Sequence, residues 1–412
     1  MKTILFLVLF ALVAILVQGQ QPKDDKKDDK KADKKPDDKK PADDKKQVQV
    51  LPVGPPPPIP TGPVLGEWPD NTVSPQPREE WLKLVDLTKV PDVPLTDPQK
   101  GPQCELLKNA CNFACGKCTR PDTDVMACPE QDQWAITYDD GPTEFTTKLL
   151  DYLDSINQKA TFFILGFRAR NNTEILRRAY RSGHHIASHT WTHSSLTSLS
   201  NDQIIGEIKW TEQFIREAIG VTPTYLRAPF GDVDDRVRAI AKQLGYKIIG
   251  WNRDTDDWKV GVPGSGVSKA TIVANYTNWV KNPPAATVGL AKGKGVISLQ
   301  HDLYAETVEA AIESINIIKQ KYKPMAVAQC LGDKTPYAEK NAVFDPNQPP
   351  APANASLSAN NPAATSLVAD ATKASGAAQS ANATPGNKTS GAELARPMAL
   401  TAVALLLALI MC

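Results

Sequence analysis

The chain has 412 residues and a formal net charge of +1, because 47 basic side chains nearly balance 46 acidic ones. This balance removes the usual electrostatic reason to expect a nucleic-acid partner, and none is predicted. The length would hold about two or three average domains. Composition shifts sharply along the chain, however, so much of it is not domain-like.

Residues 1–19 have the features of a secretory signal peptide. Lys2 precedes an unbroken apolar run from Ile4 to Val17, and the segment ending at Gly19 offers small residues for cleavage. The run is too short to span a bilayer comfortably. We therefore expect the mature protein to enter the secretory pathway.

Two segments of different amino-acid composition follow. Residues 20–65 begin with repeats of Asp-Asp-Lys-Lys and continue with a proline-rich stretch, and no apolar residue of the repeats could form a core. Such a composition is typical of a disordered segment. Residues 66–127 contain scattered apolar residues without a clear period, together with several cysteines. This segment is predicted to be an irregular, cysteine-rich arm packed on the main domain.

The cysteines are predicted to form disulfides, because secretion brings the chain into an oxidising compartment. Four of the seven lie between Cys104 and Cys118. Zinc binding is one interpretation of that spacing, but the secretory context and the missing second ligand pair favour two short disulfides. Cys128 and Cys330 bracket the region between them and are predicted to close it. Cys412 leaves with the C-terminal signal.

From 128 to 330 strand-like runs alternate with helical ones. Repeated units of this kind imply parallel strands joined by crossover helices, and about 200 residues suit one (β/α) barrel. The active groups of barrels lie where strands end and loops begin. Strands are predicted at 134–138, 160–165, 185–188, 225–226, 247–251, 295–300 and 324–328, and helices at 144–155, 173–181, 202–218, 234–244, 268–280 and 306–321.

The C-terminal part is predicted to be a stalk followed by a lipid-attachment signal. Residues 331–390 are rich in Ala, Asn, Ser, Thr and Pro, without the means to build a core. Residues 391–412 end in an apolar tail with no basic residue after it, which is typical of a GPI signal. A tail-anchoring helix is the alternative, although the apolar stretch is short for a span. Ser390 is the predicted attachment residue, and Asn387 stays open because the spacer is short.

Five sequons are candidate sites of N-linked glycosylation. They are at Asn171, Asn275, Asn354, Asn382 and Asn387.

Two adjacent carboxylates, Asp139 and Asp140, stand between an apolar run and a Gly141-Pro142 turn. Taken alone, this is ordinary turn composition. The preceding apolar run nevertheless indicates a buried strand that delivers both carboxylates to the edge of a sheet. Because adjacent carboxylates repel, keeping both ionised requires a cation or a strong donor nearby.

A histidine pair could supply the site for that cation. His189 and His193 are four residues apart, which predicts both imidazoles on one face of a helical turn. The spacing suits a divalent ion, and Asp140 is the natural third ligand. Two histidines and a carboxylate leave positions open for water and substrate, as in a catalytic zinc site.

Three further polar stretches follow predicted strands. They are Arg227-Ala228-Pro229-Phe230-Gly231, Asp254-Thr255-Asp256-Asp257-Trp258 and Leu299-Gln300-His301-Asp302. Each alone suits a surface loop. In order with the Asp-Asp and His-x3-His motifs, however, the set resembles the five motifs of the polysaccharide deacetylases, carbohydrate esterase family 4. Given its flanking signals, the chain is most similar to the GPI-anchored chitin deacetylases of fungi.

The resemblance covers roughly 128–330 and implies a deformed (β/α) barrel together with a role for each matching residue. Asp140, His189 and His193 would hold Zn2+, with Co2+ as an alternative. Asp139 would be the general base, Arg227 would orient it, His301 would be the general acid, and Asp257 would raise the pKa of His301. The Phe230 amide would stabilise the oxyanion, and Trp258 and Leu299 would form the acetyl pocket.

Three positions depart from the commonest family pattern. Tyr138 stands where Phe is common, Ala228 replaces a frequent Pro, and Phe230 replaces the usual Tyr. The role at 230 belongs to the backbone amide, so little is lost there. None of the implied catalytic or metal-binding residues is missing.

The resemblance implies a metal-dependent chitin deacetylase that converts N-acetylglucosamine residues of cell-wall chitin to chitosan with release of acetate. The alternatives are a deacetylase of partly deacetylated chitosan, peptidoglycan or xylan, or a non-catalytic glycan-binding wall protein. The expected partners are chitin or N-acetylglucosamine oligomers and a membrane, reached through the GPI lipid. No obligate protein partner is expected. The expected location is the outer side of the cell membrane and the cell wall.

Overall fold

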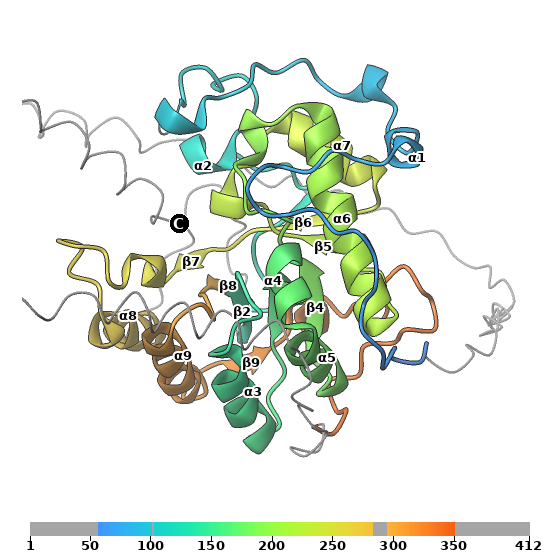
Figure 1. Ribbon diagram of the computed structural model, residues 1–412. Helices are drawn as coiled ribbons and strands as arrows, with labels where there is room; N and C mark the ends of the chain where they lie inside the picture. Colours follow the sequence, from blue (N-terminus) through green and yellow to red (C-terminus); the bar gives the residue numbers. More distant parts are fainter. Residues whose placement is uncertain (1–56, 101–102, 283–294, 351–412) are drawn as a thin grey trace, which may run out of the picture. The chain divides into compact units, whose positions relative to one another are not determined.

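The computed structural model describes residues 57–100, 103–282 and 295–350 (Figure 1). Within these residues nine strands form one sheet, in the order β1-β6-β5-β4-β3-β2-β8-β7, with β9 also paired to β2. Every pairing between named strands is parallel. The sheet is a curled, open (β/α) barrel, so the predicted fold class is confirmed.

The strands are short, and most alternate with helices. The strands are β1 (Asp124–Val125), β2 (Gln133–Asp139), β3 (Thr161–Ile164), β4 (His185–Ser188), β5 (Tyr225–Leu226), β6 (Lys247–Ile249), β7 (Arg253–Asp254), β8 (Val296–Leu299) and β9 (Lys323–Met325). The helices are α1 (Glu79–Leu82), α2 (Phe113–Gly116), α3 (Thr146–Ser155), α4 (Gly166–Asn171), α5 (Thr173–Arg181), α6 (Asn201–Ile219), α7 (Asp235–Gln243), α8 (Lys269–Lys281), α9 (Ala305–Ile318) and α10 (Val327–Cys330).

Local sequence signals account for most of these elements. The long helix α6 begins after Ser200, which exchanges hydrogen bonds with Gln203 in a capping box. It ends at Gly220, which adopts φ 82°. The short helix α4 was not predicted, because it follows β3 almost directly and carries no apolar period of its own.

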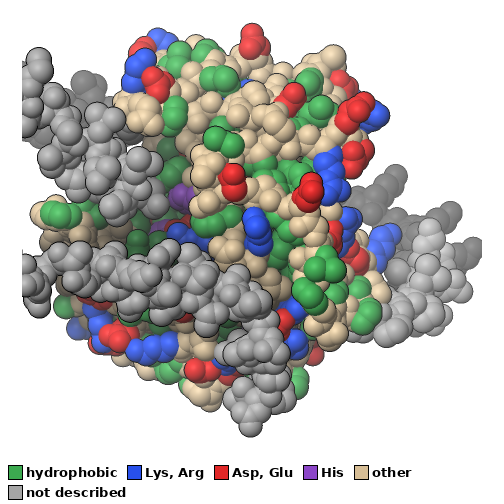
Figure 2. All heavy atoms as spheres, viewed as in Figure 1, with side chains coloured by type: hydrophobic (Ala, Val, Ile, Leu, Met, Phe, Trp, Pro, Cys, Tyr) green, Lys and Arg blue, Asp and Glu red, His purple; other side chains and the backbone are tan. Residues whose placement is uncertain are grey.

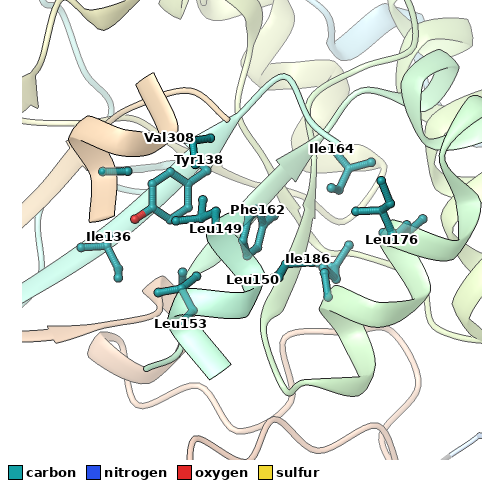
Figure 3. Packing of buried hydrophobic residues seen from close by; sticks show 14 of the residues in the cluster. Ile136, Tyr138, Leu149, Leu150, Leu153, Phe162, Ile164, Leu176, Ile186 and Val308 are labelled. Atoms are coloured by element: carbon teal, nitrogen blue, oxygen red, sulfur yellow. The ribbon is translucent and has the colours of Figure 1, made fainter. Parts of the chain in front are cut away.

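The largest core cluster lies between the strands and the helices outside them (Figure 3). Side chains of β2, β3 and β4 meet side chains of α3, α5 and α9 there. Each large side chain buried in this way contributes about 1.5–3 kcal/mol to folding. The cluster includes Ile136, Tyr138, Leu149, Leu150, Leu153, Phe162, Ile164, Leu176, Ile186 and Val308.

Three disulfides are present in the described residues. Cys104 is bonded to Cys115 and Cys111 to Cys118, so the clustered cysteines form two short disulfides. The third joins Cys128 to Cys330, which are 202 residues apart in the sequence. It ties the segment before β2 to the end of α10, and so closes the barrel region.

The segment directly after Cys330 differs from the prediction. Tyr337 and Phe344 are buried, and the Tyr337 hydroxyl accepts a hydrogen bond from the Ile186 amide at 3.1 Å. Glu339 accepts hydrogen bonds from the amide and hydroxyl of Thr222. The expectation that no core forms after 330 is therefore wrong for 331–350, which pack against the barrel.

Several predictions fall on residues outside the described ranges. These are the signal peptide 1–19, most of segment 20–65, the later stalk, the GPI signal 391–412, Ser390, and the sequons at Asn354, Asn382 and Asn387. Within the described ranges, no helix combines the length and apolar character needed to cross a membrane.

Candidate active site

The polar residues singled out by the motifs gather at the carboxyl ends of the strands. Asp139 is the last residue of β2, and Asp140 follows it. His189 follows β4, Arg227 follows β5, and His301 lies just after β8. Because all these strands are parallel, their carboxyl ends meet at one edge of the barrel.

Asp140, His189 and His193 form a compact group of metal-ligand atoms. Oδ1 of Asp140 lies 3.4 Å from Nε2 of His189 and 3.3 Å from Nε2 of His193. One ligand atom from each residue lies within 4.8 Å of the other two. The same Asp140 oxygen is buried without a hydrogen-bond partner. A divalent ion such as zinc fits this donor set and would satisfy the buried oxygen.

The tautomer of His189 also suits metal binding. Its Nδ1 lies 2.8 Å from the carbonyl oxygen of Arg227. A carbonyl can only accept a hydrogen bond, so Nδ1 carries the proton and donates it. Nε2, which faces Asp140, therefore keeps its lone pair free for a ligand bond.

The two histidines do not lie on a helical turn, so that prediction is wrong. Residues 189–193 form a loop between β4 and the following 3-10 turn, in which Thr190 has φ 71° and His193 has φ 65°. Non-glycine residues in this left-handed region cost on the order of 1–3 kcal/mol each. The loop brings the rings to 5.1 Å between centroids, so the pair converges without helical backbone.

Asp139 is held by a buried arginine. Arg227 Nη1 donates to Asp139 Oδ1 at 2.6 Å and to the Thr137 hydroxyl at 2.7 Å. The rest of the guanidinium donates to the carbonyls of Ile249 and Gly250, each at 3.1 Å. Both Asp139 and Arg227 are 1% exposed, so this is a desolvated ion pair with its donors satisfied.

His301 is paired with Asp257 near the metal group. Its Nδ1 donates to Asp257 Oδ1 at 2.7 Å, and its amide donates to the other carboxylate oxygen at 2.8 Å. Burial disfavours the imidazolium, but the Asp257 carboxylate outweighs burial and raises the pKa of His301 to about 10. A protonated histidine can donate a proton to a leaving group.

In contrast to the pKa of His301, the pKa values of two proposed metal ligands, His193 and Asp140, are lowered. Burial lowers the pKa of His193 to about 4, against the pull of Asp140. Burial by itself would raise the pKa of Asp140, but His193 and His189 outweigh it and hold that pKa well below its usual range. An ionised carboxylate and a neutral imidazole are the forms that bind metal ions.

Comparison with known proteins decides the family. Residues 127–249 match the family model described as polysaccharide deacetylase. Chitin deacetylase 2 of Saccharomyces cerevisiae is 35% identical over 269 residues, which cover 65% of this chain and 78% of that protein. The chain belongs to the polysaccharide deacetylase family. The predicted membership of this family is thereby confirmed.

Other relatives of this polysaccharide deacetylase are also fungal. Chitin deacetylase 1 of Cryptococcus neoformans var. grubii is 37% identical over 271 residues, covering 62% of this chain. The chain spans 56% of the length of that relative and 54% of the chitin deacetylase of Amylomyces rouxii. The solved chitin deacetylase of Colletotrichum lindemuthianum is 32% identical, with 54% of this chain and 97% of that chain covered and a TM-score of 0.47.

The three residues expected to contact substrate have different environments in this polysaccharide deacetylase. Phe230 has φ 60° in a 3-10 turn, and its ring lies edge-on to His193 with centroids 4.6 Å apart. Trp258, in the turn Asp257–Lys259, is 48% exposed. Leu299, at the end of β8, is only 5% exposed. Figure 2 shows histidine side chains inside a hollow on this face of the molecule.

The two sequons within the described residues lie on helices. Asn171 is exposed at the end of α4, whereas Asn275 is partly buried within α8.

Sequence reasoning missed two residues that bond groups of the site, Thr137 and Glu207, and one exposed aromatic residue, Tyr304. Thr137 shares the Arg227 guanidinium with Asp139. Glu207 is fully buried on α6 and bonds the loop between His189 and His193. Tyr304, three residues beyond His301, is 46% exposed. Only Glu207 carried a usable signal, because it places a charge among the apolar positions of an amphipathic helix.

Proposed function

We propose that this protein is a metal-dependent chitin deacetylase, which hydrolyses the N-acetyl groups of N-acetylglucosamine residues to give chitosan and acetate. The observation that carries the proposal is the juxtaposition of two groups. One is the Asp140–His189–His193 cluster, in which Asp140 and His189 are buried, and the other is the adjacent Asp139–Arg227 pair. The printed names of the fungal relatives support chitin as the substrate.

The metal would be held by Asp140, His189 and His193, with Zn2+ the proposed ion and Co2+ an alternative. When bound, such an ion polarises the substrate carbonyl and lowers the pKa of the attacking water. The other groups of the site are then needed to move protons and to hold the substrate.

Asp139 would act as the general base. Its second carboxylate oxygen, Oδ2, lies 3.9 Å from Nε2 of His189 and so faces the metal group, while Oδ1 is bonded to Arg227. Arg227 would keep the carboxylate oriented. The two adjacent aspartates thus have separate tasks, one binding the metal and one accepting a proton.

His301 would act as the general acid. An amide nitrogen leaves readily only after it is protonated, so an acid separate from the base is required. Asp257 orients the imidazole and stabilises its protonated form. Asp139 and His301 form an isolated parallel bridge, so the residue proposed as the acid lies beside the residue proposed as the base.

The substrate would be held by groups around this centre. The Phe230 amide would donate to the developing oxyanion, and Trp258 and Leu299 would line the acetyl pocket. Phe230, Trp258 and Tyr304 are exposed aromatic residues on three loops that follow β5, β7 and β8. Aromatic faces pack well against the apolar faces of sugar rings, so these three residues support a polysaccharide substrate.

The domain organisation and location are also proposals. We infer a signal peptide at 1–19, a disordered segment within 20–65, an arm at 66–127 and a catalytic domain at 128–330. A stalk would follow 350, and 391–412 would be exchanged for a GPI lipid at Ser390 or Asn387. The enzyme would then face the cell wall from the outer side of the membrane, with glycans at the sequons.

The deciding experiment is a panel of acetate-release assays with the purified full chain. Chitin oligomers, partly deacetylated chitosan, peptidoglycan and acetylxylan are compared, each with and without a chelator. We expect acetate from chitin oligomers, loss of activity with the chelator, and recovery when zinc is added back. If acetate is released only from acetylxylan or only from peptidoglycan, that glycan would replace chitin as the proposed substrate. If the zinc-loaded protein releases acetate from none of these glycans, the alternative of a non-catalytic glycan-binding protein would replace the deacetylase.

A further inference from the structure

The loop between the two proposed histidine ligands is strained and must be held in place. Thr190 and His193 both adopt left-handed backbone conformations, at φ 71° and φ 65°. Neither residue is glycine, so each costs free energy in this conformation. The conformation is nevertheless the one that turns Nε2 of His189 and Nε2 of His193 toward Asp140. Some other part of the protein must offset the strain.

Glu207 bonds this loop from the inside. Its Oε2 accepts hydrogen bonds from the amides of Trp191 and Thr192, each at 2.8 Å. Its Oε1 accepts a further hydrogen bond from the Thr192 hydroxyl. Glu207 is fully buried on α6, so a single carboxylate bonds two of the three residues between His189 and His193 in a dry environment. Hydrogen bonds to an ionised acceptor are stronger than neutral ones.

Residues of the N-terminal arm (66–127) contact the same loop through Trp191. The ring of Trp68 stacks on Trp191 at 5.9 Å between centroids, and the Asp70 carbonyl accepts a hydrogen bond from Trp191 Nε1 at 3.1 Å. Gly166 lies beneath the Trp191 ring, since a Cβ there would come within 2.2 Å of it. Packing therefore immobilises the indole, and the carboxylate fixes the backbone of the loop.

We propose that Glu207 is a positioning residue for the metal site. By accepting from three donors of Trp191 and Thr192, it holds the loop so that both imidazoles face Asp140 before an ion arrives. The inference rests on the proposed metal site, but it concerns the affinity for the ion rather than the reaction. Partners that orient metal ligands typically change metal affinity about 10–100-fold.

The test compares zinc affinity between two glutamines introduced on the same helix. Glu207→Gln keeps the shape but exchanges one acceptor oxygen for an amino group that faces loop donors. Glu212→Gln is the matched control. Glu212 is also buried on α6, but its carboxylate accepts from the Tyr246 hydroxyl at 2.9 Å and pairs with Lys209. Zinc dissociation constants are measured on the full chain by competition with a chromophoric chelator, with the thermal midpoint of each metal-free protein measured in parallel.

We expect Glu207→Gln to raise the zinc dissociation constant at least about tenfold, and Glu212→Gln to leave it within threefold of the wild type. A constant within threefold for folded Glu207→Gln, or an equal rise in both variants, would overturn the inference. If Glu207→Gln does not fold, Thr192→Val decides, because it removes one of the three donors; an unchanged constant then refutes the proposal.

The failure of the inference differs from the failure of the proposed function. A wild type that binds no zinc, or that releases no acetate when loaded, contradicts the proposed function. If the wild type binds zinc and Glu207→Gln has the same zinc dissociation constant, only the proposed role of Glu207 is contradicted.

Discussion

The guanidinium of Arg227 donates to Asp139 at 2.6 Å, and both residues are almost completely buried. The backbone carbonyl oxygen of Arg227 also accepts a hydrogen bond from His189 Nδ1 at 2.8 Å. Arg227 therefore orients the proposed base with its side chain and a proposed metal ligand with its backbone. A substitution at 227 changes only the first contact, which allows the two effects to be separated.

Arg227→Met is expected to lower the free energy of unfolding by about 3–5 kcal/mol, because it leaves the buried Asp139 carboxylate without its partner. Acetate release should fall as well, since Asp139 loses its orientation. Urea denaturation and acetate release check both effects. The control is Arg120→Met, which breaks an exposed pair with Asp235 and should change stability very little. Equal losses in the two variants would contradict this account.

Asp139→Asn should strongly lower turnover while zinc stays bound. The amide keeps the shape of the carboxylate but cannot accept a proton, so kcat should fall about 10²–10⁴-fold. Asp140→Asn is the contrasting variant, because it removes a ligand charge and should lower zinc content as well. Zinc per protein and kcat are measured for each. Full turnover by Asp139→Asn would exclude this residue as the base.

The pH profile should report the His301–Asp257 pair. His301 must be protonated to act as an acid, and its folded pKa is raised to about 10 from an ordinary 6.5. Activity should therefore fall as the pH rises through the folded pKa of His301. The pair also stabilises the fold fully below the unfolded pKa, and this contribution is lost as the pH rises toward 10.

Asp257→Asn removes the main charge that raises the pKa of His301, so the alkaline limb of kcat should move to lower pH. The control is Asp256→Asn at the neighbouring residue, whose carboxylate is paired with Lys259 rather than with His301. Its alkaline limb should stay in place. An unshifted limb in Asp257→Asn would show that His301 does not produce it.

The disulfide Cys128–Cys330 should contribute more stability than the two short ones. It closes a loop with a sequence separation of 202, against 11 for Cys104–Cys115. A disulfide removes more entropy from the unfolded chain when it closes a longer loop. The Cys128→Ser/Cys330→Ser double variant should therefore have a free energy of unfolding lower by about 2–5 kcal/mol. Cys104→Ser/Cys115→Ser should lose less. Urea midpoints under oxidising conditions test the order, and a reversed order would refute it.

Much of the barrel could be predicted from local pattern. Helix α5 and strands β4 and β5 have the bounds that their sequence patterns predict. The first six predicted strands end within two residues of the observed ends, because short apolar runs stop at polar motifs such as Asp139-Asp140. The strand predicted at 324–328 is wrong in part, because β9 ends at Met325 and the helix α10 begins at Val327. The burial of Tyr337 could not be predicted. It depends on the Ile186 amide, which lies 151 residues away in the sequence.

The loop of His189 and His193 marks the limit of spacing arguments. Four residues of separation suit a helical turn, yet the backbone there is a loop with two left-handed residues. Spacing limits how far apart two side chains can lie but not the backbone that joins them. The loop conformation depends on Glu207 and Trp68, and no local pattern shows that either residue contacts this loop.

The sequence alone indicated the residue types of the candidate site: two carboxylates, two histidines, an arginine and a further histidine, each at the end of a strand or in the loop that follows it. Residue type and local hydrophobic pattern suffice for that, because they act over a few neighbouring positions. Only the tertiary structure decided how these groups are held, because it showed the backbone of the loop that joins His189 to His193 and the contacts of Glu207 and Trp68 with that loop. Arg227 lies against Asp139, and the histidine pair faces Asp140, because parallel strands bring distant loops to one edge of the barrel.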